Sequence, residues 1–164
     1  MMKRMKRIVL IVICLLTLAM LQTMVMPKYF PLGFVPDFLL LTVLLLGFWK
    51  PNASGFWLGS LLGAFQGWLH GFSWWAFALS RGFAAIFAGW MRVQWLWQSP
   101  IAAGFCAALG TAFAETFLAL LLILSERSIV PIKLLLPIVA FEAPVNAFLA
   151  FALSWFKQPK EVLA

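Results

Sequence analysis

Residues 100–124 read PIAAGFCAALGTAFAETFLALLLIL, and Glu115 is the only charged side chain in this run. An α-helix needs about 20 apolar residues to cross the hydrocarbon core of a bilayer, so the run is long enough for one crossing. The rest of the chain has the same character, since 65% of its 164 residues are hydrophobic and 10% are charged. A soluble globular domain has about 25% charged residues. The sequence therefore predicts an all-α integral membrane protein.

Apolar runs separated by Pro, Gly and charged residues divide the chain into six expected helices. They cover residues 8–26, 36–49, 53–71, 73–91, 100–124 and 133–156. The second run is the shortest, because its 14 residues cover only ~21 Å at the helical rise. Such a helix must begin earlier, tilt little or thin the bilayer locally. The expected fold is a six-transmembrane-helix bundle that uses residues 1–164 as a single domain.

Basic residues indicate the orientation, because cytoplasmic loops carry an excess of Lys and Arg. With the N-terminus inside, the cytoplasmic side carries eight of them: Lys3, Arg4, Lys6, Arg7, Lys50, Arg92, Lys157 and Lys160. The outer side carries three: Lys28, Arg127 and Lys133. We therefore expect both termini in the cytoplasm. The basic residues mark the ends of apolar runs instead of forming a patch, so the net charge of +7 does not indicate nucleic-acid binding.

Glycines recur every four residues in the third expected helix, at Gly55, Gly59, Gly63, Gly67 and Gly71. Such a ridge of small residues lets another helix backbone approach closely. We expect it to pack within this protein, and the fifth helix offers a similar stripe at Ala103, Ala107 and Thr111. The alternative is that part of the ridge faces the spanning helix of a partner protein.

Three charged residues lie well inside expected helices: Arg81, Glu115 and Glu142. Each costs roughly 2.5–3.5 kcal/mol to place at the centre of a membrane helix, so each needs a partner. Counted from the outer helix ends, all three lie ~12–13 Å deep. We expect Arg81 to pair with Glu115, Glu142 or both, as a clamp between helices. A proton or ion relay and a polar contact to a partner are the alternatives.

Two further polar positions concern helix ends and bends. Asp37 follows Pro36 at the start of the second helix, where a short acceptor side chain caps free backbone N–H groups. Pro144 lacks an N–H, so it leaves the carbonyl group of Ala140 without its helical donor, and Asn146 is placed to compensate.

Catalytic and metal-binding patterns are missing from the sequence. It contains no H-E-x-x-H, G-x-S-x-G or Walker A motif. His70 is the only histidine, and one histidine without further ligands or a nucleophile makes neither a metal site nor a catalytic dyad. We expect no enzyme activity, no cofactor and no metal.

Four stretches of the chain resemble the family of bacterial rod shape-determining proteins called MreD. They are PDFLLL at 36–41, LGSLLGAFQGWLHG at 58–71, FAETFLALLL at 113–122, and LLP followed by PVNAFLA at 135–150. Family members commonly carry an acid where this chain has Gln66 or Gly67, so no family role is carried over to that position.

The resemblance implies a non-enzymatic component of the bacterial inner membrane that helps to maintain rod shape. Its implied partners are the single-span protein MreC and the cell-elongation proteins MreB, RodA and a class B penicillin-binding protein. It also implies a fold similar to the substrate-binding subunits of energy-coupling factor vitamin transporters. Such a subunit is the alternative function, although it needs an outer pocket with convergent polar groups. A channel or another transporter is less well supported, because the sequence has no repeated half.

Overall fold

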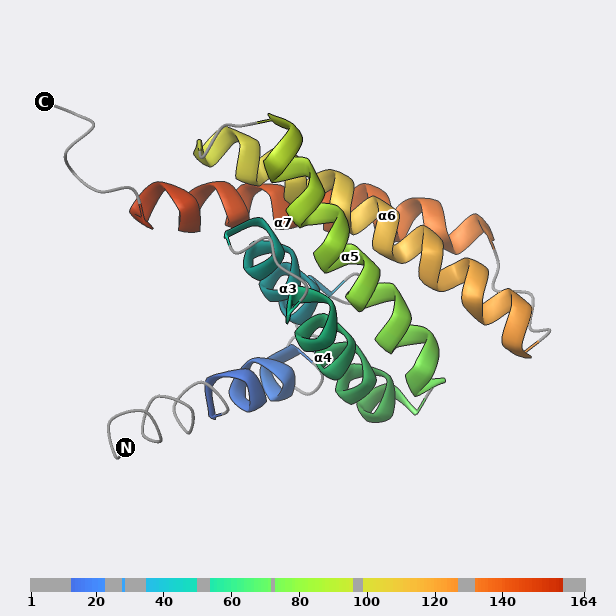
Figure 1. Cartoon of the computed structure of the whole chain (residues 1–164). Helices are drawn as coiled ribbons and strands as arrows, with labels where there is room; N and C mark the ends of the chain where they lie inside the picture. Colours follow the sequence, from blue (N-terminus) through green and yellow to red (C-terminus); the bar gives the residue numbers. More distant parts are fainter. Residues whose placement is uncertain are drawn as a thin grey trace, which may run out of the picture.

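A computed structural model describes residues 13–22, 28, 35–49, 54–71, 73–95, 99–126 and 132–157 of the chain. These residues are helical apart from short connections, and no strand occurs among them. Five helices are labelled in Figure 1: α3 (Phe38–Trp49), α4 (Ser54–His70), α5 (Trp74–Trp95), α6 (Pro100–Glu126) and α7 (Ile132–Lys157). A further helical segment covers residues 13–22. The all-α class expected from the sequence is confirmed.

The helix ends follow local sequence signals. Ser99 caps α6, because its Oγ accepts a hydrogen bond of 3.1 Å from the N–H of Ala102, and Pro100 occupies the first helical position. Gly71 ends α4 with a φ of +68°, a conformation that glycine adopts without strain. The fourth expected helix ends at 91, whereas α5 continues to Trp95. Arg92 lies in this extension, and its Nη1 donates to the carbonyl groups of Phe48 and Trp49 at the end of α3.

Two of the described helices are long and apolar enough to cross a membrane. They are Pro100–Ser125, with a mean hydropathy of 2.0, and Leu135–Phe156, with a mean hydropathy of 1.8. In the 18-residue apolar stretch of each segment, only 33% and 17% of the residues are buried. The core helix of a soluble protein would be mostly buried, so the outward apolar surface of α6 and α7 favours a lipid environment.

α3 is short but central. It contacts each of α4, α5, α6 and α7, and eight of its 12 residues are buried. A 12-residue helix covers only ~18 Å of a hydrocarbon core ~30 Å thick. The start of α3 is surrounded by protein, since Pro36 and Asp37 are buried. The second helix was expected from residue 36, and an earlier start would have lengthened it. α3 begins at Phe38, so it is not lengthened in this way.

The glycines of α4 face α5 and not another protein. A Cβ added to Gly59 would lie 2.6 Å from the carbonyl oxygen of Arg81, and one added to Gly67 would lie 2.8 Å from Cα of Trp74. A Cβ on Gly63 would collide with the carbonyl oxygen of Phe77. The ridge is therefore an internal packing surface, which makes the alternative of a partner's helix wrong for these three positions.

Two details of the glycine prediction are also wrong. The ridge packs on α5, whereas the stripe of Ala103, Ala107 and Thr111 on α6 faces other helices: Ala107 packs with Leu41 and Leu45 of α3 and with Ala150 of α7. Gly71 does not belong to the ridge, since a Cβ there would meet nothing within 4 Å. Four-residue spacing identifies a close-packing face but does not identify the helix that covers it.

Candidate functional site

The start of α3 carries the first element of the site. Oδ1 of Asp37 accepts a hydrogen bond of 2.8 Å from the N–H of Leu40, and the Asp37 carbonyl group accepts one of 2.9 Å from the N–H of Leu41. These are the side-chain and main-chain bonds of a helix N-cap. Asp37 therefore caps α3 as expected, and it is only 4% exposed.

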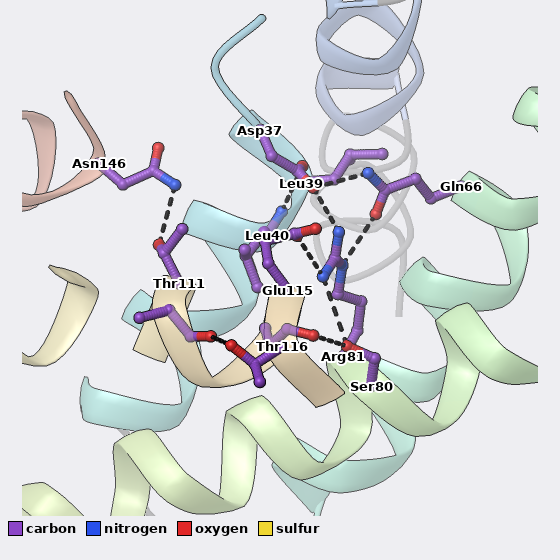
Figure 2. A network of polar contacts seen from close by, with 12 residues as sticks. Asp37, Leu39, Leu40, Gln66, Ser80, Arg81, Thr111, Glu115, Thr116 and Asn146 are labelled. Atoms are coloured by element: carbon purple, nitrogen blue, oxygen red, sulfur yellow. Dashed lines mark hydrogen bonds and ion pairs between the residues drawn. The ribbon is translucent and has the colours of Figure 1, made fainter. Parts of the chain in front are cut away.

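Arg81 connects three helices through two carboxylates (Figure 2). Its Nη2 lies 2.7 Å from Oδ2 of Asp37 on α3, and its Nη1 lies 2.8 Å from Oε1 of Glu115 on α6. The contact with Asp37 is also a hydrogen bond, whereas that with Glu115 is a close ion pair without an aligned hydrogen bond. Arg81 is 2% exposed. The expected pairing of Arg81 with Glu115 is thus present, and the pairing with Asp37 is an addition that the sequence did not reveal.

Two buried amides complete this arrangement. Gln66 of α4 donates from Nε2 to Oδ2 of Asp37 at 2.7 Å and accepts at Oε1 from Nε of Arg81 at 3.1 Å. Gln22, from the N-terminal helical segment, donates to Oδ1 of Asp37 at 3.2 Å. We call Asp37, Gln66, Arg81 and Glu115 the polar clamp. The sequence indicated that Gln66 lies near a packing surface, since it is a polar residue one position before a ridge glycine. Nothing in the sequence indicated its partners.

Several groups of the polar clamp compensate the buried charge of Arg81. Asp37 offsets the guanidinium charge directly, and the Gln66 amide bridges the two groups. Removing one partner of a buried ion pair leaves an uncompensated charge and costs roughly 3–5 kcal/mol. The clamp therefore locks α3, α4, α5 and α6 in one arrangement.

A second polar contact joins α6 to α7. Nδ2 of Asn146 donates to Oγ1 of Thr111 at 3.0 Å, and both residues are fully buried. Figure 2 shows the amide nitrogen turned toward Thr111 and the amide oxygen turned away from it. Asn146 was expected to compensate the carbonyl group of Ala140 opposite Pro144, but its amide donates across the helix interface instead. α7 continues through Pro144 without a break.

Glu142 lies on the same buried side of α7, one turn before Asn146. It is 9% exposed and makes no ion pair with Arg81, so of the two acids expected as partners of Arg81 only Glu115 pairs with it. Glu142 is near enough to interact electrostatically with Glu115, Asp37 and Arg81. Oε2 of Glu142 and Oδ1 of Asn146 have no hydrogen-bond partner among the described residues. Asp37, Glu115 and Glu142 therefore place three carboxylates near the single guanidinium group of Arg81.

The site offers no evident catalytic chemistry. His70 is exposed at the end of α4, where its ring lies 6.0 Å from that of Phe77. Cys106 is buried among apolar residues, whereas Cys14 is exposed. Within the described ranges, no group of three or more His, Cys, Asp and Glu side chains has a geometry that could hold a metal ion. The arrangement is suited to holding helices together and to compensating charge.

Comparisons with protein-family models, with curated proteins and with solved structures found no match to this chain.

Proposed function

We propose that the chain is a multi-pass protein of the bacterial inner membrane that crosses the bilayer six times and acts as a non-enzymatic scaffold of cell elongation. In this proposal, it helps to maintain rod shape by binding a single-span protein of the MreC type and the peptidoglycan synthesis complex. The polar clamp carries the proposal on the structural side. Its charged groups and the Gln66 amide bind one another across four helices, which serves rigidity and not turnover. The partners come from the resemblance to MreD.

The directions of α4, α5, α6 and α7 support alternating crossings. Gly59 packs on Arg81 and Gly67 on Trp74, so α4 and α5 run antiparallel. α5 and α6 are also antiparallel, because Ser80 Oγ donates to the carbonyl group of Ala114 and Cys106 contacts the carbonyl group of Ala88. α6 and α7 are antiparallel as well, because Thr111 pairs with Asn146 and Gly104 packs on Phe151. A chain that crosses a membrane at every helix needs this alternation.

The outward face of α4 is the surface that we propose for a spanning partner. It lies opposite the glycine ridge and exposes Trp57, Leu61 and Trp68, which are 68%, 67% and 71% exposed. α4 contacts α5 and α3. Large apolar side chains on a rigid helix give a neighbouring helix extensive packing contacts without any change in the bundle.

Topology is tested first, by single-cysteine labelling in intact cells on a background without Cys14 and Cys106. A membrane-impermeant maleimide should label Arg127→Cys, and it should label Lys50→Cys and Lys160→Cys only after the membrane is permeabilised. Labelling of Lys160→Cys in intact cells would contradict an inward C-terminus and, with it, six crossings.

The partner is tested by purification of the tagged chain from native membranes in mild detergent. We expect cell-wall synthesis proteins and a single-span protein in the eluate, and their loss in a Trp57→Ala/Leu61→Ala/Trp68→Ala variant. A variant with Phe148→Ala and Leu136→Ala, on the exposed face of α7, is the matched control. Retention of every partner by the first variant would exclude α4 as the interface.

The same experiment separates the alternative function, the substrate-binding subunit of a vitamin transporter. The oxygen atoms of Glu142 and Asn146 that lack a partner favour this alternative, because a bound ligand could use them. Co-purification with an energising ATPase module, in place of cell-wall synthesis proteins, would replace the scaffold proposal by the transporter.

A further inference from the structure

The buried side of α7 carries polar groups that the polar clamp does not use. Glu142, Asn146, Ala150 and Ser154 recur every four residues and are all buried. Oε2 of Glu142, Oδ1 of Asn146 and Oγ of Ser154 lack a hydrogen-bond partner among the described residues. A few unsatisfied buried polar atoms occur in any protein, and a bound ion or water molecule is one common reason.

The packing of α6 against α7 brings Glu115 to the level of Glu142. The two helices run antiparallel, and Thr111 pairs with Asn146 at 3.0 Å. Glu115 lies one turn beyond Thr111, and Glu142 lies one turn before Asn146. Both steps point in the same direction along the bundle, and each covers ~6 Å at the helical rise. Glu115 and Glu142 therefore lie at the same level of the interface, one turn from Asn146.

The charges around this pair are not balanced. Arg81 is shared between Asp37 and Glu115, and Glu142 has no ion-pair partner within the described part of the chain. If all three acids are ionised, these four residues carry a net charge of −2. An uncompensated carboxylate at this depth is costly, so a positive species is expected to reside there.

We propose that Glu142, Asn146 and Glu115 form a binding site for one exchangeable alkali cation between α6 and α7. The free atoms on α7 are acceptors, which suits a cation and not an anion. A cation can bind oxygen atoms of several side chains, whereas a proton joins at most two oxygen atoms. A singly charged cation offsets the charge of Glu142, the carboxylate of these four residues that has no ion-pair partner in the described structure. The site is independent of the proposed scaffold function.

The direct test measures binding of ²²Na⁺, and of ⁸⁶Rb⁺ as a tracer for K⁺, to the chain purified in detergent. We expect saturable binding of one ion per chain that unlabelled alkali chloride displaces and choline chloride does not. Glu142→Gln should abolish this binding, since it removes the charge but keeps the size. Ser154→Ala is the matched control, because Ser154 lies on the same stripe but ~12 Å beyond Asn146.

Thermal unfolding gives a second readout. At constant ionic strength and pH, replacing choline by the bound ion should raise the Tm of the wild type and of Ser154→Ala, but not that of Glu142→Gln. The absence of saturable binding of either tracer to the folded wild type would overturn the proposal. If the wild type is then stabilised only by lowering the pH, and Glu142→Gln abolishes that response, the two carboxyls share a proton instead.

Discussion

The interface between α4 and α5 brings two backbones together through Gly59, Gly63 and Gly67, whereas the interface between α6 and α7 brings polar side chains together. In the first, a Cβ would collide with the neighbouring backbone, so there is no space for another molecule. In the second, oxygen atoms of Glu142 and Asn146 lack partners among the described residues. The comparison shows that close backbone packing fills the interface between α4 and α5, whereas the interface between α6 and α7 contains polar atoms that are free to bind something else.

The largest expected effect tests the interface between α4 and α5. Gly63→Leu should prevent α4 from packing on α5, because even its Cβ would collide with the carbonyl group of Phe77 and lie 2.9 Å from Cβ of Arg81. We expect a loss above about 4 kcal/mol, as in other severe overpacking substitutions. Size-exclusion profiles in detergent and thermal unfolding measure it.

Gly55→Ala is the control for that substitution within the same ridge. Its Cβ would meet only the Cβ of Ala85, at an ordinary 3.8 Å. Alanine favours helix by roughly 0.5–1 kcal/mol over glycine, so the variant should be as stable as the wild type or slightly more stable. Equal destabilisation by Gly55→Ala and Gly63→Leu would contradict the close packing of α4 on α5 at Gly63.

The next largest effect concerns the polar clamp, which connects α4 and α5 to α6. Arg81→Met should destabilise the protein by roughly 3–5 kcal/mol, because Asp37 and Glu115 lose their shared cation. Arg92→Met is the control, since Arg92 donates to carbonyl groups at the end of α3 and contacts no carboxylate in the described structure. A smaller loss in Arg81→Met than in Arg92→Met, measured by thermal unfolding, would mean that the clamp does not hold the bundle.

A moderate effect is expected at the bond between α6 and α7. Thr111→Val and Asn146→Leu should each cost about 1–3 kcal/mol, because each leaves the other buried polar group without its partner. The double variant should lose less than the sum of the two. Strict additivity in a double-mutant cycle would show that the two residues do not interact.

The smallest expected effect distinguishes Glu142, which has no ion-pair partner in the described structure, from Glu115, which pairs with Arg81. In choline buffer, Glu142→Gln should leave stability unchanged or raise it by up to about 1 kcal/mol, because the variant removes an unpaired buried charge. Glu115→Gln should instead destabilise, because it removes a partner of Arg81. Thermal unfolding of both variants side by side measures the difference, and a reversal of their order would contradict the assignment of Glu115 to the clamp.

Some features of the site followed from composition and spacing, and others did not. Arg81 and Glu115 stood out because charges inside apolar runs need partners, and the structure pairs them. Asp37 was recognised as a cap, but its ion pair with Arg81 was missed because only charges well inside the expected helices, and not one at a helix end, were expected to need a partner. Gln66 was passed over because an uncharged amide carries no cost large enough to demand a partner.

The sequence by itself determined that the chain forms apolar helices with approximate ends, because hydrophobic runs, prolines, glycines and capping residues act locally. It also determined that the glycine face of α4 is a close-packing surface, since small side chains at four-residue spacing form one ridge. Only the tertiary structure decided that α5 covers this ridge, that Arg81 reaches Asp37, and that Glu142 makes no ion pair with Arg81. These outcomes depend on which helix faces meet, and many apolar faces of similar shape could have met instead.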